Sequence, residues 1–176
     1  MTRRDLVWKL AYIAIAGVVF MIDQTTKALV TNNLRFGEDF PVISGFLNFT
    51  HARNPGVAFS MFDNMGDVGR WGLSFVAFLA MTAVIYFIWR TRSTDSLTLT
   101  ALSLMLAGIV GNVTDRIRLG FVVDFIDVQF GSWHYDVFNV ADAAICIGAV
   151  LLILDMLIKS RKGAAMQIPQ SEIQPS

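Results

Sequence analysis

Four long stretches of the chain are nearly free of charged residues, and they constrain its fold more than any other feature. They cover residues 6–22, 71–89, 97–113 and 137–158. A helix needs roughly 20 mostly apolar residues, with about 17 as the lower limit, to cross the hydrocarbon core of a bilayer. Each stretch meets that length, so the sequence predicts an all-α polytopic membrane protein built on a bundle of four transmembrane helices.

The composition agrees with this prediction and narrows the function. Of the 176 residues, 55% are apolar and 16% are charged, whereas an average soluble domain is about 25% charged. Basic and acidic residues balance to a net charge of zero, which argues against an electrostatic nucleic-acid binder. Cys146, His51 and His134 show no zinc-ligand spacing. We therefore expect no metal and no cofactor.

The first stretch has a rival interpretation as a cleavable signal peptide, because Arg3 and Arg4 precede it. Residues 21–24 offer no small-residue cleavage site, and three further spans follow, so we interpret the stretch as the first transmembrane helix. Eight of the fourteen basic residues lie in the two termini and in the loop 90–96. The positive-inside rule then predicts cytoplasmic termini and two outward loops, 23–70 and 114–136.

The outward loops contain patterns typical of strands. Residues 46–50 alternate apolar and polar, as in a half-buried strand. Residues 121–128, a turn at 130–132 and residues 133–137 predict a hairpin. We expect a small sheet at the outer membrane surface. The membrane domain then covers residues 1–162, and the Pro-, Gln- and Ser-containing segment 163–176 predicts a disordered cytoplasmic tail.

Polar and ionisable residues gather at the outer ends of the predicted helices. Placing an ionisable group at membrane depth costs free energy, so each of these residues is expected to have a structural or functional role. The first and third helices run outward and the fourth begins outside, which brings these residues to one depth. They are Asp23, Lys27, Asn112, Asp115, Arg116, Asp124, Asn139 and Asp142.

Two of these residues, Asp124 and Asp142, are the candidate catalytic pair. Each lies among apolar neighbours, and Ala141 and Ala143 leave space for a substrate backbone beside Asp142. Two carboxyl groups close together in an apolar pocket cannot both ionise cheaply, so one keeps its proton near neutral pH. The ionised group can activate water and the protonated one can donate to a carbonyl oxygen, which is general acid–base peptide hydrolysis.

Purely structural roles compete with this interpretation. Asp142 could cap the fourth helix, and Asp124 could be a solvated loop residue. Asp23 with Lys27 is typical of an interfacial salt bridge. Two other classes also stay open, namely a small proton-coupled transporter or relay and a non-catalytic assembly factor. Against a transporter, no charge lies in the second and third stretches, so no relay crosses the bilayer.

Five short motifs in order resemble those of lipoprotein signal peptidase, the type II signal peptidase of bacteria. They are Asp23-Gln24-Thr25-Thr26-Lys27, residues 54–59 (NPGVAF), residues 111–116 (GNVTDR), Val123-Asp124-Phe125 and residues 138–142 (FNVAD). The resemblance covers nearly the whole chain apart from its C-terminal tail.

The resemblance implies an aspartic endopeptidase of the bacterial inner membrane with its active site near the periplasmic face. It would remove signal peptides from prolipoproteins by cleaving before a diacylglyceryl-modified cysteine, and globomycin would inhibit it. It implies a β-cradle in roughly 42–54 and 119–136 and a short helix near 59–66, and we expect a monomer among membrane lipids. Asp124 and Asp142 would be catalytic. Expected to position the substrate are Asn54, Gly56, Asn112, Arg116 and Asn139; expected to support the site are Asp23, Lys27, Asp115 and Ala141.

Overall fold

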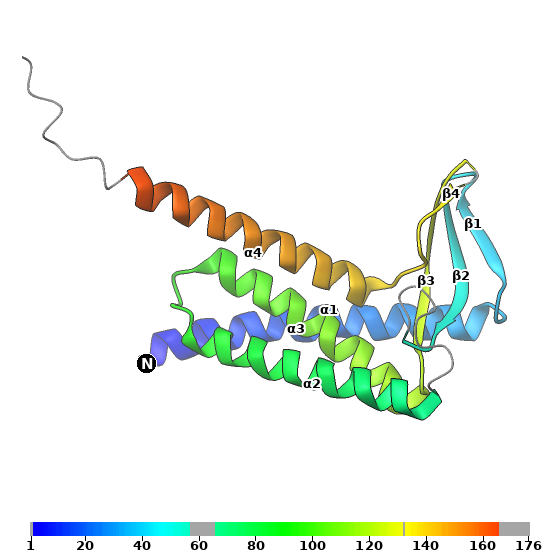
Figure 1. Cartoon of the computed structure of the whole chain (residues 1–176), viewed down its shortest axis with the longest axis horizontal. Coiled ribbons are helices and arrows are strands. Elements are labelled where there is room, and N and C mark those ends of the chain that lie inside the picture. The colour runs from blue at the N-terminus through cyan, green and yellow to red at the C-terminus, as the bar shows by residue number, and fades with distance from the viewer. Residues whose placement is uncertain (1, 57–65, 132, 166–176) are drawn as a thin grey trace, which may run out of the picture.

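Four long helices lie along one another, and a small antiparallel sheet covers one end of them (Figure 1). The computed structural model describes residues 2–56, 66–131 and 133–165. The helices are α1 (Arg3–Asn33), α2 (Gly66–Arg90), α3 (Ser96–Leu119) and α4 (Val140–Ala165); the strands are β1 (Asp39–Ile43), β2 (Leu47–Asn54), β3 (Val122–Phe130) and β4 (Trp133–His134). All four helices are long and apolar enough to cross a membrane. The predicted fold class is confirmed.

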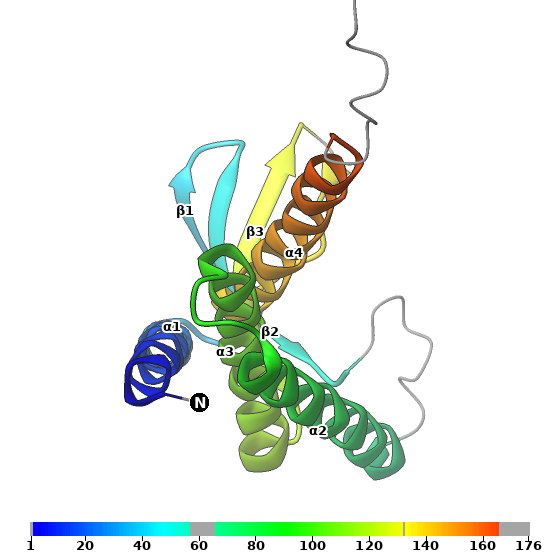
Figure 2. The ribbon, with the colours of Figure 1, turned by 90° about the vertical axis from the view of Figure 1, so that its left-hand side faces the viewer.

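Helix α3 lies at the centre of the bundle and packs against α1, α2 and α4 (Figure 2). More than half of its apolar span is buried, whereas less than a quarter of each of the other three spans is buried. Small residues explain this position, because they let neighbouring backbones approach closely in a membrane. At Gly108 of α3, an added Cβ would collide with the backbone carbonyl oxygen of Ala141 in α4. This close approach sets where the start of α4 lies.

The helices extend beyond the apolar stretches. Helix α1 continues eleven residues past Ile22, so Asp23 and Lys27 lie on a helix inside the protein and not in a loop. Lys9 of α1 is buried against α2: its Nζ donates to the carbonyl oxygen of Trp89 and lies 5.7 Å from that ring. Residues 163–165 belong to α4 and not to a disordered tail. The rest of the predicted tail, and nearly all of the predicted helix near 59–66, lie outside the described residues.

The sheet has the order β1-β2-β3-β4, and each neighbouring pair is antiparallel. The predicted hairpin is present as β3 and β4, but β3 continues to Phe130 and β4 has two residues instead of the predicted 133–137. In the β2–β3 pair, Phe49 lies opposite Ile126 and Ala52 lies opposite Asp124, so two residues of β2 face one residue of β3. Such a bulge bends a strand and redirects its side chains. It lies directly beside the candidate residue Asp124.

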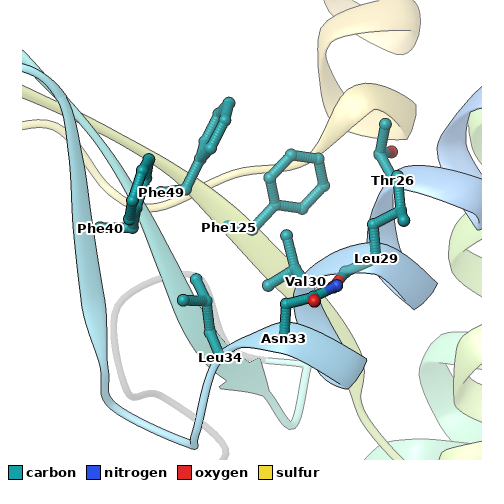
Figure 3. A pocket seen from close by; sticks show the side chains of 8 residues that line it. All are labelled: Thr26, Leu29, Val30, Asn33, Leu34, Phe40, Phe49 and Phe125. Carbon is teal, nitrogen blue, oxygen red and sulfur yellow. The ribbon is translucent and has the colours of Figure 1, made fainter.

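One face of the sheet is apolar and lies over the outer end of α1 (Figure 3). Phe40 of β1 pairs with Phe49 of β2, and Phe49 contacts Phe125 of β3 with ring centroids 6.0 Å apart. A cavity of about 420 Å³ separates this face from α1. Its lining has no charged side chain and consists of Thr26, Leu29, Val30, Asn33, Leu34, Phe40, Phe49 and Phe125.

Candidate active site

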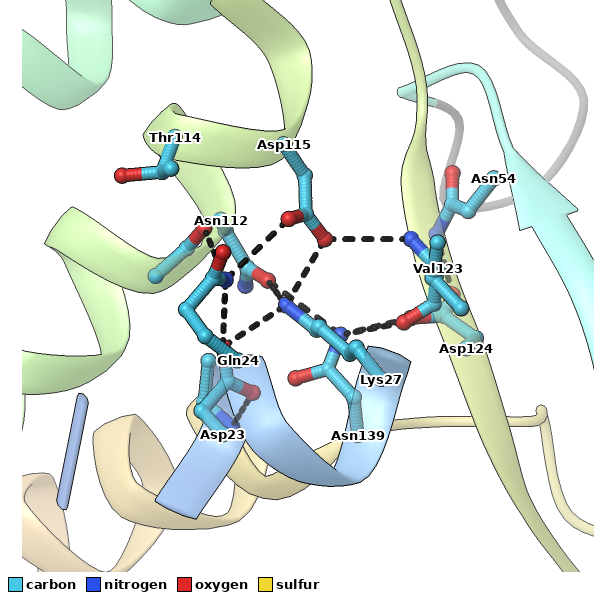
Figure 4. A network of polar contacts seen from close by, with 12 residues as sticks. Asp23, Gln24, Lys27, Asn54, Asn112, Thr114, Asp115, Val123, Asp124 and Asn139 are labelled. Atoms are coloured by element: carbon cyan, nitrogen blue, oxygen red, sulfur yellow. Dashed lines mark hydrogen bonds and ion pairs between the residues drawn. The ribbon is translucent and has the colours of Figure 1, made fainter. Parts of the chain in front are cut away.

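A buried lysine lies at the centre of the polar network between α1 and α3 (Figure 4). The Nζ atom of Lys27 is 3.0 Å from Asp23 Oδ2 and 2.9 Å from Asp115 Oδ2, and it donates to Asn112 Oδ1 at 3.1 Å. An ammonium group has three hydrogens to donate, so these three partners use all of them. Lys27, Asp23 and Asp115 are each 3% exposed or less. The group is therefore a buried ion triad and not the interfacial salt bridge that the sequence suggested.

The two carboxylates of the triad also fix the elements that carry the candidate dyad. Asp23 Oδ1 accepts a hydrogen bond from the backbone N–H of Ala141 at 2.9 Å, which ties α1 to the start of α4. Asp115 Oδ2 accepts from the backbone N–H of Val123 at 3.2 Å, which ties α3 to β3. Asp142 and Asp124 are the next residues along the chain from these two N–H groups. The triad therefore positions both members of the dyad.

Asn139 connects the two candidate catalytic carboxylates. Its side-chain Nδ2 donates to Asp124 Oδ1 at 2.6 Å, and its backbone N–H donates to Asp142 Oδ2 at 3.1 Å. Its Oδ1 accepts from the backbone N–H of Asp142 at 2.9 Å. This reciprocal pair is a capping box at the N-terminus of α4. Asp142 does cap the helix, as the structural alternative proposed, but only one of its oxygens serves this role, because Oδ1 accepts from Asn112 Nδ2 at 2.8 Å.

Asp124 is buried, at 2% exposed, and both of its oxygens accept hydrogen bonds. Asn54 Nδ2 donates to Oδ2 at 3.0 Å, and Asn139 donates to Oδ1. Burial raises the pKa of Asp124 from 3.8 to about 6, and the negative charge of Asp142 adds to the increase; hydrogen bonds from Asn54 and Asn139 oppose it. Asp124 is therefore not a solvated loop residue. It belongs to a strand, and its carboxylate is held by Asn54 of β2 and by Asn139, which precedes α4.

Arg116 and Gly56 lie at the margin of this network. The Nε atom of Arg116 is buried and has no hydrogen-bond partner within the described part of the chain. The charges of Asp142, Asp124 and Asp115 all act on its guanidinium group. Gly56 has a φ of +118° and donates its backbone N–H to Asn54 Oδ1 at 2.9 Å. A Cβ at Gly56 would collide with the Leu73 side chain and lie 3.9 Å from Arg116 Nε.

The fold brings residues of all five motifs close together. The convergence of polar residues at one depth predicted this for four of the motifs, whereas Asn54 and Gly56 of the second motif were expected only from the resemblance. One participant, Gln24, was missed as a site residue. Its Nε2 donates to Asp23 Oδ2 and to Asp115 Oδ1, both at 3.1 Å. An uncharged side chain beside two expected charges gives little signal in a hydropathy argument. Its place within the first motif was the available clue. Across residues 2–56, 66–131 and 133–165, no cluster of His, Cys, Asp or Glu is arranged to hold a metal ion.

Comparison with known proteins decides the family. A sequence model described as signal peptidase (SPase) II matches residues 15–158. The chain belongs to the signal peptidase II family. The lipoprotein signal peptidase of Syntrophus aciditrophicus is 40% identical over 86% of this chain and 94% of its own length. The lipoprotein signal peptidase of Polynucleobacter necessarius subsp. necessarius is 44% identical over 86% of this chain and 91% of its own length.

Solved structures agree with the family assignment. A bacterial membrane enzyme solved at 2.3 Å resolution by the in meso method superposes with a TM-score of 0.76 at 34% identity, over 85% of this chain and 89% of that one. A second bacterial membrane enzyme, solved at 1.9 Å resolution, superposes with a TM-score of 0.74 at 34% identity, over 84% of this chain and 92% of that one. Membership of the signal peptidase II family makes this chain a multi-pass peptidase of the bacterial inner membrane that removes signal peptides from lipoproteins.

Proposed function

We propose that the chain is an aspartic endopeptidase that cleaves prolipoproteins directly before a diacylglyceryl-modified cysteine. In this proposal Asp124 and Asp142 activate a water molecule, and no covalent intermediate forms. The observation that carries it is the arrangement of Asn139, which donates one hydrogen bond to each of the two carboxylates. This arrangement orients two acidic groups from distant parts of the chain toward one place.

The dyad works with one proton shared between its two carboxyl groups. The ionised group takes a proton from water while the water oxygen bonds to the carbonyl carbon, and the protonated group gives its proton to the carbonyl oxygen. Collapse of the tetrahedral intermediate re-forms the C=O bond and breaks the C–N bond. The carboxyl group that took the proton from water gives it to the leaving nitrogen, and the hydroxyl proton of the intermediate returns to the other carboxylate, which restores the dyad. The raised pKa of Asp124, about 6, supports a proton retained within the pair.

The surrounding residues would position the peptide. The buried Nε of Arg116, without a partner among the described residues, is suited to donate to a substrate carbonyl. Asn54, Asn112 and Asn139 hold the dyad's oxygens by hydrogen bonds from their side-chain amide groups. Gly56, which has no side chain, allows the Leu73 side chain to pack where a Cβ would otherwise lie, close to Arg116. Asp23, Lys27, Asp115 and Ala141 would support the site through the buried triad and its bond to α4.

Two further features support a lipid-bearing substrate at the membrane surface. The uncharged cavity beside β3 favours apolar groups over charged ones. The charge bias of the loops supports cytoplasmic termini, and with that orientation the dyad would lie near the periplasmic face. There a lipidated cysteine would hold its bond at the right depth, because each buried methylene contributes about 0.8 kcal/mol to anchoring. We expect the enzyme to act as a monomer and to bind globomycin at this site.

A cleavage assay with a synthetic diacylglyceryl peptide tests the proposal. The native protein should release the signal segment directly before the lipidated cysteine, and globomycin should stop the reaction. Asp124→Asn and Asp142→Asn should each abolish turnover while the protein still inserts and unfolds at a similar temperature.

Two other buried aspartates in the same elements provide matched controls. Asp127→Asn alters β3 three residues beyond Asp124, and Asp155→Asn alters α4 far from Asp142. Both controls should keep their turnover. Full activity in either dyad variant, or equal losses in all four, would reject the assignment of Asp124 and Asp142 as the catalytic pair.

A further inference from the structure

The C-terminal end of α3 is held by a side chain of another helix. The last four carbonyl groups of a helix have no partner within it, and in α3 these belong to residues 116–119. The backbone N–H of Gly120 donates to the carbonyl oxygen of Arg116 at 3.1 Å. Arg70 of α2 supplies two more donors: its Nε donates to the same oxygen and its Nη2 donates to the carbonyl oxygen of Ile117, both at 2.7 Å. One guanidinium group therefore binds two adjacent carbonyls of the last turn.

The guanidinium group of Arg70 is fixed by its surroundings. Its Cζ lies 5.0 Å from the centroid of the Trp71 ring, within the range of a cation–π contact. It also packs over Gly120, where an added Cβ would lie 3.7 Å from Nη1. A positive charge is favoured at the C-terminus of a helix, where the helix dipole is negative. Geometry and charge therefore both suit Arg70 to cap α3.

Helix α2 approaches the side chain of Arg116 as well as its backbone. Leu73 lies three residues after Arg70, on the same face of α2. An added Cβ at Gly56 would collide with the Leu73 side chain and would lie 3.9 Å from Arg116 Nε. Leu73 and the Arg116 guanidinium therefore flank the same point beside Gly56. The charges of the dyad act on this guanidinium, and its buried Nε has no hydrogen-bond partner among the residues that the structure describes.

We propose that Arg70 is a positioning residue for the peptidase reaction, because it holds Arg116 where the Arg116 guanidinium faces the dyad. This inference rests on the proposed role of Arg116 in binding a substrate carbonyl. Arg116 begins the last turn of α3, and the ends of helices fray. Without Arg70, the carbonyls of residues 116 and 117 would lose their donors from α2, and the last turn would be free to shift. A displacement of about 1 Å can lower a rate by about 100-fold.

Cleavage kinetics of the full chain with a synthetic diacylglyceryl peptide test the proposal. Arg70→Met removes both donors, whereas Arg70→Lys keeps the charge but replaces the planar fork by an ammonium group. Below the melting temperature of each variant, kcat/KM should fall by about 10- to 100-fold in Arg70→Met and by less in Arg70→Lys. Arg118→Met is the matched control, because it removes an exposed positive charge from the same turn of α3. It should keep the native kcat/KM, and equal values for Arg70→Met and the control would overturn the proposal.

The Nε–H group of Arg116 gives a second readout that needs no activity. In protein with isotope-labelled arginine, its NMR signal is assigned as the one that is lost in Arg116→Lys. Arg70→Met should shift this signal and accelerate its exchange with water, whereas Arg118→Met should change neither.

The two readouts together separate this inference from the proposed function. An unchanged Arg116 signal in Arg70→Met would overturn the inference. A shifted signal with native kcat/KM would also overturn it, because Arg70 would then hold the helix end without serving the reaction. If the native protein cleaved no peptide, the proposed function would fail, and the signal would still show whether Arg70 holds Arg116.

Discussion

The buried ammonium of Lys27 offers the sharpest test of how this site is held together. Lys27→Met keeps the length and most of the volume of the side chain but removes its charge. Asp23 and Asp115 then face each other without the cation that lies 3.0 and 2.9 Å from them. Removing one partner of a buried ion pair costs about 3–5 kcal/mol, because the remaining charge is buried without compensation. A melting temperature falls by roughly 2–4 °C per kcal/mol in a chain of this size, so we expect a decrease of roughly 6–20 °C.

The chain contains a matched control at the opposite end of the bundle. Lys159 of α4 pairs with Asp155 at the same i, i+4 spacing and at 2.7 Å, but the lysine side chain is 50% exposed. Exposed pairs contribute about 0–1 kcal/mol, so Lys159→Met should lower the melting temperature by less than roughly 4 °C. Thermal unfolding of both variants in the same detergent makes the comparison.

A second variant tests whether charge is the cause. Adding Asp23→Asn to Lys27→Met restores the net charge of the triad to its native value, while the Asn oxygen can still accept from the N–H of Ala141. The double variant should therefore recover part of the lost stability. If Lys27→Met and Lys159→Met lower the melting temperature equally, burial does not decide the effect and the reasoning fails.

Three further predictions concern the dyad and the packing around it. Burial raises the pKa of Asp124 from 3.8, its value in the unfolded chain, to about 6 in the folded protein. The folded protein therefore binds this proton more tightly, and the resulting stabilisation is fully present below pH 3.8 and is lost as the pH rises through 6. The free energy of unfolding of the native protein should thus fall by roughly 2 kcal/mol relative to Asp124→Asn between pH 4 and 7, and parallel stability curves would contradict this. Asn139→Ser keeps an oxygen for the helix cap but loses the amide that donates to Asp124, so it and Asn139→Ala should both lose turnover. Only the Ala variant should also lose about 1 kcal/mol of capping energy, measured by thermal unfolding, and equal melting temperatures would rule out the cap. Gly108→Ala should cost about 1–3 kcal/mol because its Cβ meets the Ala141 carbonyl. A Cβ at Gly17 would meet nothing within 4 Å, so Gly17→Ala should be neutral or stabilising by up to about 1 kcal/mol. Similar melting temperatures for Gly108→Ala and Gly17→Ala would show that the close approach at Gly108 is not needed.

The sequence was sufficient to predict the depth of the site in the membrane, but not the contacts between its residues. Depth follows from counting residues along each span, because every helix rises by a constant amount per residue. This reasoning brought Asp23, Asn112 and Asp142 to the same level. It could not show that Lys27 is fully buried or that Gln24 bonds to two carboxylates, because burial depends on which helix face meets a neighbour. It also extended α1 only to Ile22, since charged residues end an apolar stretch without ending a helix.

The sequence by itself determined that this chain forms four membrane spans with polar residues concentrated at one end, because the cost of placing charge in hydrocarbon depends on composition and length alone. Tertiary structure decided what those polar residues do. The approach of α4 at Gly108, the bulge in β2 beside Asp124 and the bonds from Asp23 and Asp115 bring residues 124 and 142 to one residue, Asn139. These are contacts between segments distant in sequence, and they depend on how the elements pack, which no local pattern of residues encodes.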